Sequence, residues 1–142
     1  MRANGRGEFK CLGWQVKHEG NNIVVDQNDY INNKLNLLDI ITHGVDPNLE
    51  LNEEEKSQLR NIVGKLRWAA DQTRIDRAYY VLMLSMVMNK AMIKDIKVAN
   101  KAIKVLKSAE LPLRFVKLTG ETWYITVYSD ASFKNLPDGV SS

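Results

Sequence analysis

Two features of the sequence could carry chemistry: a row of lysines in the last third of the chain and one aspartate beyond it. The row consists of Lys94, Lys97, Lys101 and Lys104. These lysines step by three or four residues, so they share one face of a helix, and Ile96, Ile103 and Leu106 should turn away from it. With Asp95 as the only acid nearby, the lysine row could follow a phosphate backbone. A solvated helix face explains the same spacing, so both interpretations remain open.

Asp130 is the second feature, because it stands at the end of the alternating segment Trp123–Tyr128. A carboxylate at the end of a rigid strand is a common ligand of Mg²⁺. Hydrolysis by two metal ions needs several converging carboxylates, and only Asp138 follows, in a Pro-Asp-Gly turn. On spacing alone, a turn or capping aspartate is the simpler interpretation.

Composition narrows the classes of function. The chain of 142 residues is 44% hydrophobic and 26% charged, with a net charge of +3, which permits a polyanionic partner without requiring one. The single cysteine, Cys11, excludes an internal disulfide and a multi-cysteine zinc site. No apolar run approaches the ~20 residues of a membrane-spanning helix. We therefore expect an intracellular protein, cytoplasmic or nuclear, with no membrane partner.

The elements that would position these residues begin with a β-hairpin. Phe9–Val16 and Ile23–Val25 are expected to be its strands, because Gly20 and Asn21 between them can adopt the positive φ of a hairpin turn. Residues 26–41 then carry apolar side chains at helical spacing and predict a first helix.

Three further helices are predicted. Asn52 and Glu55 have the spacing of a capping box and begin the second helix. Thr73 and Asp76 form a similar pair and should begin the third, while the fourth should cover Ile93–Ser108.

The C-terminal part is expected to be a second antiparallel hairpin. Leu111–Leu118 and residues 122–129 read as its strands, joined by a turn at Gly120, with Asp130 at the end of the second strand. The predicted class is therefore α+β: an N-terminal β-hairpin, about four helices and a C-terminal antiparallel β-hairpin.

Five segments, taken in order, resemble the Pol polyprotein of copia-type retrotransposons. They are Phe9–Gly13, Asp26–Ile31, Leu59–Asp76, Asn100–Lys107 and Tyr128–Ser132. The first two are similar to the primer-gripping hairpin of the reverse-transcriptase palm and to the element that opens the thumb. The third resembles a Gly-x-Leu-x-Trp helix followed by Gln-Thr-Arg-Pro-Asp, and the last two a linking helix and the start of ribonuclease H. Ile75 departs from the pattern, which usually has proline there.

The resemblance implies three parts. Residues 1–41 would be the end of the palm and the first thumb helix, residues 42–109 the helical thumb and connection region, and residues 110–142 a truncated start of a ribonuclease H-like domain. In the full-length protein, this segment would position an RNA–DNA hybrid or primer–template duplex beside the remainder of the Pol polyprotein.

The resemblance also implies roles for single residues. Leu12, Gly13 and Trp14 would lie near the primer terminus, the lysine row would face phosphates, and Asp130 would be one Mg²⁺ ligand of ribonuclease H. The polymerase aspartates and the other ribonuclease H carboxylates have no counterpart in the sequence. We therefore expect Mg²⁺ to serve only the full-length protein, and the chain alone to bind no cofactor and catalyse nothing.

Two other interpretations remain open: a non-catalytic helical module from a decayed retroelement that binds a protein partner, and a genomic relic with no selected function. Salt dependence would identify phosphate binding, because burial of an apolar helix face does not weaken steeply with added salt. The fragment interpretation also predicts that the hairpin at residues 8–25 packs loosely and leaves apolar residues exposed on one face, where a palm sheet would lie.

Overall fold

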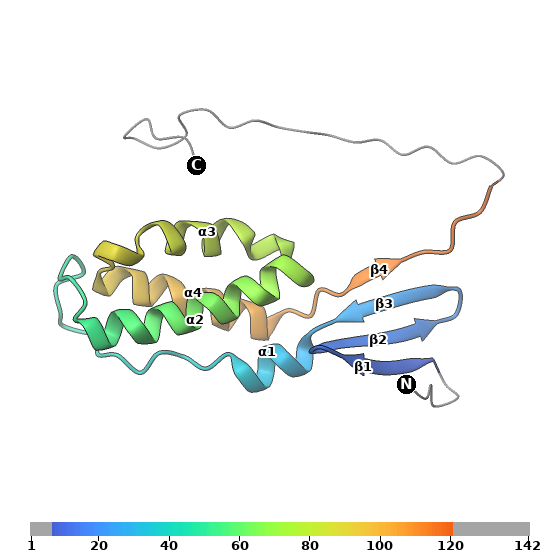
Figure 1. Cartoon of the computed structure of the whole chain (residues 1–142), viewed down its shortest axis with the longest axis horizontal. Helices are drawn as coiled ribbons and strands as arrows, with labels where there is room; N and C mark the ends of the chain where they lie inside the picture. Colours follow the sequence, from blue (N-terminus) through green and yellow to red (C-terminus); the bar gives the residue numbers. More distant parts are fainter. Residues whose placement is uncertain (1–6, 121–142) are drawn as a thin grey trace.

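The computed structural model describes residues 7–120, which have the predicted α+β class: a four-stranded sheet beside a helical body (Figure 1). The strands are β1 (Glu8–Cys11), β2 (Trp14–Glu19), β3 (Asn22–Asp26) and β4 (Leu113–Phe115). The helices are α1 (Asn28–Lys34), α2 (Glu53–Gln72), α3 (Ala78–Met86) and α4 (Ile93–Ser108), with short 3₁₀ helices at Ile75–Arg77 and Met88–Lys90. The sheet lies at one end of the helices, so the molecule is elongated (Figure 1).

The segment predicted as one strand, Phe9–Val16, is two strands joined by a tight turn. Leu12 and Gly13 form this turn with φ angles of 49° and 86°, and Cys11 pairs with Trp14 on either side of it. Two consecutive positive φ angles match the twist of a two-residue hairpin. The prediction was wrong because a leucine rarely adopts this backbone conformation, so nothing but Gly13 indicated a turn.

β4 joins the N-terminal sheet. It pairs antiparallel with β3, where Val24 lies opposite Arg114, giving the strand order β1-β2-β3-β4. The Arg114 guanidinium also donates to the Glu19 carboxylate at 2.7 Å. Of the predicted extended segment Leu111–Leu118, three residues form a strand, and their partner among the described residues is β3. The predicted second strand, residues 122–129, and Asp130 lie outside the described residues.

One face of the sheet is apolar and partly uncovered. The strand register places Phe9, Val16, Ile23 and Phe115 on the same face. Val16 is buried, whereas the three others are exposed. The predicted exposure of apolar residues on one face of the N-terminal hairpin is therefore confirmed, and the surface is of the kind that often marks a contact with another protein.

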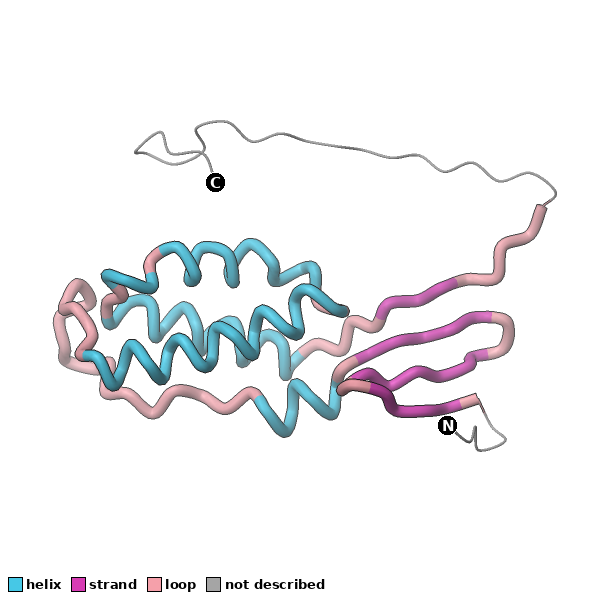
Figure 2. Tube along the Cα trace, in the orientation of Figure 1, coloured by secondary structure: helices cyan, strands magenta, loops and turns pink. Residues whose placement is uncertain are grey.

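The first helix is shorter than predicted. Residues 26–41 contain α1, but the chain leaves the helix at Leu35 and continues without regular structure along the helical body (Figure 2). Leu35 and Leu38 are still buried, as their spacing suggested. The Leu38 N–H donates to Oδ1 of Asn100 at 2.8 Å, and Nδ2 of Asn100 donates to the Leu38 carbonyl at 3.0 Å. This side chain from α4 replaces the helical hydrogen bonds that the leucine would otherwise make.

The longer helices largely follow their sequence signals. The Asn52–Glu55 capping box is present, with both hydrogen bonds at 2.9 Å, and α4 has the predicted bounds. The predicted capping role of Thr73 is wrong. Its backbone ends α2, and its hydroxyl donates to Oε1 of Gln27 at 2.9 Å.

One hydrophobic core joins all four helices. Leu59, Leu66, Leu84, Ile96 and Ile103 are almost completely buried in it, and Leu35 and Leu38 belong to the same cluster. Within residues 7–120, none of the helices is both long enough and apolar enough to cross a bilayer.

Candidate nucleic-acid interface

The lysine row lies on the solvent side of α4. Lys94, Lys97, Lys101 and Lys104 are all exposed, and Ile96, Ile103 and Leu106 are buried in the core. The predicted orientation of this helix is therefore confirmed. It follows from packing the apolar stripe of α4 against the other helices, which leaves the opposite stripe to solvent.

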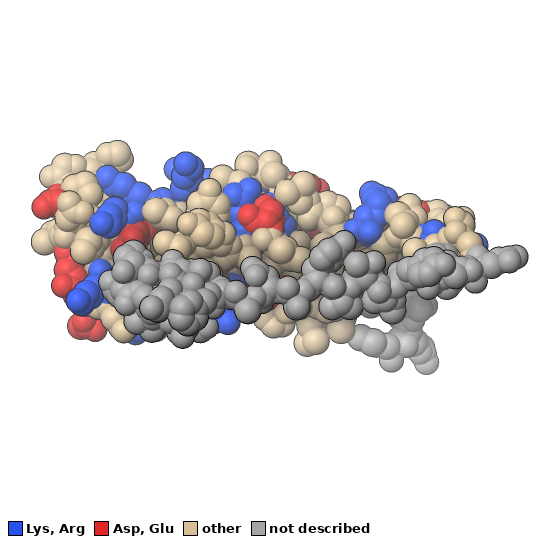
Figure 3. Space-filling model, turned by 90° about the horizontal axis from the view of Figure 1, so that it is seen from above, with Lys and Arg blue, Asp and Glu red and all other residues tan. Residues whose placement is uncertain are grey.

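The positive charge of the row is not neutralised by neighbouring side chains. Over residues 7–120, none of its four ammonium groups forms an ion pair. The carboxylate of Asp95 instead accepts from the Met92 N–H at 2.8 Å. Three glutamates occupy the first turn of α2, and Figure 3 shows acidic and basic side chains mixed at that end of the helical body. The four ammonium groups of the row are therefore exposed and without an ion-pair partner among residues 7–120.

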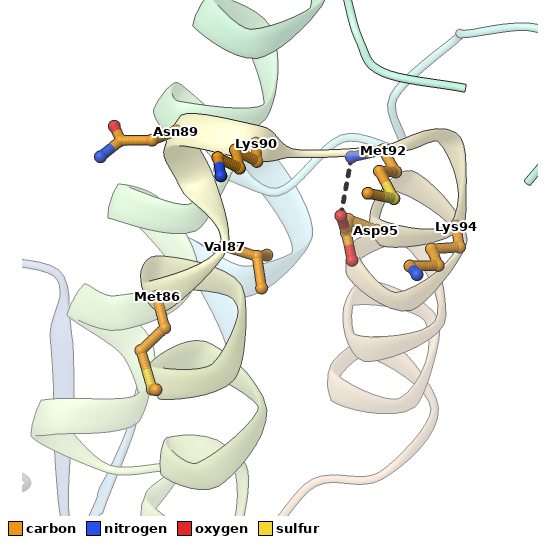
Figure 4. A pocket seen from close by; sticks show the side chains of 7 residues that line it. All are labelled: Met86, Val87, Asn89, Lys90, Met92, Lys94 and Asp95. Atoms are coloured by element: carbon orange, nitrogen blue, oxygen red, sulfur yellow. Dashed lines mark hydrogen bonds between the residues drawn. The ribbon is translucent and has the colours of Figure 1, made fainter. Parts of the chain in front are cut away.

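Two hollows lie along the seam between α3 and α4, and a member of the lysine row lines each of them. The larger, of about 430 Å³, lies where α3 ends and α4 begins (Figure 4). Its lining residues are Met86, Val87, Asn89, Lys90, Met92, Lys94 and Asp95. The smaller, of about 150 Å³, is lined by Arg77, Tyr80, Val98, Lys101, Ala102 and Val105. The α3–α4 seam thus combines apolar walls with ammonium groups.

The three residues expected near a primer terminus lie together at the β1–β2 turn. The Leu12 side chain is 79% exposed. Its backbone is in the left-handed region, which costs about 1–2 kcal/mol for a residue with a Cβ. A Cβ atom at Gly13 would lie 3.8 Å from the Tyr30 ring and 3.9 Å from the Trp68 indole nitrogen. The turn therefore packs against α1 and α2, whereas the lysine row lies on α4. Strained residues of this kind cluster at functional sites, which keeps the turn a candidate contact.

A buried arginine is the most tightly held polar group of the helical body, and the sequence prediction missed it. Arg74 is 2% exposed. Its Nη1 donates to the carbonyls of Leu106 at 3.1 Å and Ala109 at 2.8 Å, which closes the C-terminal end of α4. Its Nε and Nη2 donate to the two carboxylate oxygens of Asp76 at 2.9 and 3.1 Å. The hydrogen bonds from Arg74 lower the pKa of the Asp76 carboxyl below its ordinary value of 3.8.

Thr73, the neighbour of this arginine, joins two of the segments that carry the resemblance. Thr73 and Arg74 follow α2, and Gln27, which precedes α1, accepts the hydrogen bond from Thr73. Gln27 is almost completely buried. The spacing of Thr73 and Asp76 had indicated a helix cap, but the Thr73 hydroxyl donates to Gln27 instead, and the Asp76 carboxylate accepts from Arg74 and Arg77.

The structure brings no metal ligands together in its described part. Over residues 7–120, no group of three or more histidine, cysteine, aspartate or glutamate side chains could hold a metal ion. Asp130, the predicted Mg²⁺ ligand, lies outside these residues. Comparison of the chain with protein-family models, curated proteins and solved structures gave no match.

Proposed function

We propose that this chain positions nucleic acid as part of a reverse transcriptase/ribonuclease H polyprotein of the copia type, and that the lysine row is its contact with the phosphate backbone. An RNA–DNA hybrid or primer–template duplex is the proposed ligand. We propose no catalysis by the chain alone, and Mg²⁺ only for the full-length protein. The observation that carries the proposal is the row of four exposed ammonium groups, which form no ion pairs with residues 7–120.

The dimensions of the row fit a phosphate backbone. An α-helix rises ~1.5 Å per residue, so Lys94 and Lys104 are separated by ~15 Å along α4. A B-form duplex rises ~3.4 Å per base pair along its axis, so the row would cover about four base-pair steps where α4 lies parallel to that axis. This length allows several ammonium groups to reach phosphates of the same duplex.

The exposed apolar face of the sheet supports the polyprotein part of the proposal. Phe9, Ile23 and Phe115 share this face and are all exposed. The remainder of the polyprotein is the proposed cover for them, because a neighbouring domain would remove this apolar area from water.

Salt titration tests the phosphate contact. Binding of a fluorescent RNA–DNA hybrid to the full chain should weaken with added salt, with a logarithmic slope of roughly −0.9 per contacted phosphate in a B-like duplex. Four contacts therefore predict a slope of about −3 to −4, measured by fluorescence polarisation. Absence of binding at low salt, or binding that does not respond to salt, would contradict the proposal.

Lys94→Glu should change affinity and stability in opposite directions. Lys94 lies in the first turn of α4, where a cation opposes the helix dipole. The glutamate should raise the free energy of unfolding by about 0.5 kcal/mol, measured by urea unfolding, while weakening binding of the hybrid several-fold. Lys104→Glu, which lies before the last turn of α4, is the control: it should weaken binding equally and leave the free energy of unfolding nearly unchanged. Tighter binding by the Lys94 variant would contradict the proposed contact.

A helical protein-interaction module is the second candidate, and α3 favours it. Exposed apolar side chains recur along this helix at helical spacing: Tyr79, Leu82, Met83 and Met86. An apolar stripe of this kind is typical of a helix that packs against a partner. A partner held by this face would bind with little dependence on salt, so the titration above separates the two functions.

A further inference from the structure

We propose that the smaller hollow of the α3–α4 seam binds one unpaired pyrimidine base of a single strand. This inference rests on the proposed phosphate contact of the lysine row. It adds that the row also accepts strands with exposed bases, with one base seated beside Tyr80.

The size of the hollow suits one aromatic ring. Its volume is about 150 Å³, and a cavity of about that volume in another protein accommodates benzene. Pockets for drug-sized ligands are larger, roughly 300–1,000 Å³. A six-membered pyrimidine ring therefore fits the hollow better than a fused purine or a whole nucleotide.

The walls of the hollow offer an aromatic ring on one side and aliphatic side chains on the other. Tyr80 comes from α3, while Val98 and Val105 come from α4. Tyr80 is 42% exposed, so its ring is accessible to a ligand. The Tyr79 ring meets it edge-on, with the ring centroids 6.0 Å apart, which restrains its orientation. A restrained, accessible aromatic ring is the usual platform for stacking a nucleic-acid base.

Two cations line the hollow together with Tyr80. Lys101 belongs to the lysine row, and the Arg77 guanidinium lies over the Tyr80 ring, with its carbon 5.8 Å from the ring centroid. Nε of Arg77 donates to Asp76 at 2.8 Å, and no acceptor among residues 7–120 engages its two terminal nitrogens. A base beside Tyr80 would bring its phosphates to these cations. Because Lys97 and Lys104 continue the row on either side of Lys101, a regular polyanion matches the surface better than a single acidic group does.

Comparison with an abasic strand distinguishes binding through the base from binding through the phosphates. Polarisation would compare a labelled thymidine oligonucleotide of ~10 nucleotides, a typical length for single-strand sites, with an abasic strand of equal length. The thymidine strand should bind the full chain roughly tenfold more tightly, since stacking acts on the base alone. An adenosine strand should fall between the two, because a purine exceeds the hollow.

Variants test whether the preference for the thymidine strand over the abasic strand comes from the hollow. Tyr80→Ala should lower binding of the thymidine strand to the level of the abasic strand and leave abasic binding unchanged, while Tyr80→Phe keeps the preference. Val98→Phe, which fills the hollow without removing the tyrosine, should also abolish it. Leu82→Ala is the matched control, because Leu82 is exposed on the same helix but lines a different hollow, between α2 and α3, and its loss should preserve the preference.

The outcomes distinguish this inference from the proposed function. Equal, salt-sensitive binding of both strands by the unmodified chain would overturn the base site and leave the phosphate contact standing. A preference that survives both Tyr80→Ala and Val98→Phe would also overturn the site. If neither strand nor the hybrid binds, both proposals fail, and binding of an aromatic, acidic peptide in their place would assign the hollow to a protein partner.

Discussion

Arg74→Ala is expected to lower the free energy of unfolding by about 3 kcal/mol, measured by urea unfolding followed by circular dichroism. The substitution removes the donor to the carbonyls of Leu106 and Ala109 and leaves the Asp76 carboxylate without its main partner. Buried polar groups that lose their partners keep the full penalty of desolvation. The C-terminal end of α4 should therefore loosen along with its contact to α2.

Arg67→Ala is the matched control. Like Arg74, Arg67 forms an ion pair with a nearby aspartate: its Nε lies 3.4 Å from the carboxylate of Asp71, four residues later. The Arg67 side chain, however, is 68% exposed. An exposed pair contributes at most ~1 kcal/mol, so this variant should be nearly neutral. Similar losses in the two variants would contradict the role assigned to the buried arginine.

The pH dependence of stability gives a second readout for Arg74. The folded-state pKa of Asp76 is lowered from 3.8, so its stabilising contribution is present above that value and is lost as the pH falls through the folded-state pKa. Replacing Arg74 removes the largest cause of that shift. The unmodified chain should therefore lose the part of its advantage over Arg74→Ala that comes from Asp76 progressively at pH values below 3.8, and keep the part that comes from the Leu106 and Ala109 carbonyls.

The double variant K97E/K101E should bind an RNA–DNA hybrid roughly hundredfold more weakly at low salt, and its salt slope should be shallower by about 2. Both lysines are exposed in the middle of the row, so each substitution removes one phosphate contact and adds a repulsive charge. Fluorescence polarisation over a range of salt concentrations measures both quantities.

R60E/K117E is the control for net charge. It makes the same change in total charge at two exposed positions outside α4. Its effect on affinity should be much smaller and should come only from the long-range field. Equal weakening by the two double variants would mean that attraction to the whole chain, not contact with the row, holds the nucleic acid.

The parts of the fold that were predicted correctly depend on neighbouring residues. α4 is amphipathic along its whole length, so its spacing indicated its bounds, its buried face and its exposed lysines. The Asn52–Glu55 box is a local hydrogen-bond pair, and it begins α2 as expected.

The errors occur where distant residues decide the local structure. Residues 35–41 have helical spacing, but the Asn100 side chain holds Leu38 in a non-helical segment. Thr73 and Asp76 have the spacing of a cap, but the Thr73 hydroxyl donates to Gln27, which precedes α1. Neither partner can be identified from spacing alone, because each lies more than one helix away in the sequence.

The candidate site also has a part that the sequence predicted and a part that it did not. The lysine row belongs to one helix, so its spacing was sufficient to predict a continuous charged face. The hollow beside Tyr80 needs Arg77 from one element and Lys101 from another, so it exists only after α3 packs on α4. Tyr80 carried no local signal that distinguished it from a core aromatic.

The pairing of β4 with β3 has a consequence for the order of folding. β1, β2 and β3 are joined by short turns and can pair within microseconds, whereas β4 reaches β3 only after every helix between them has been placed. Closing so long a loop costs conformational entropy, and the three residues of β4 form few hydrogen bonds to offset that cost. Arg74 holds Ala109, just before β4, and so shortens the remaining search. β4 should therefore be the last strand to add during folding and the first to detach when α4 loosens.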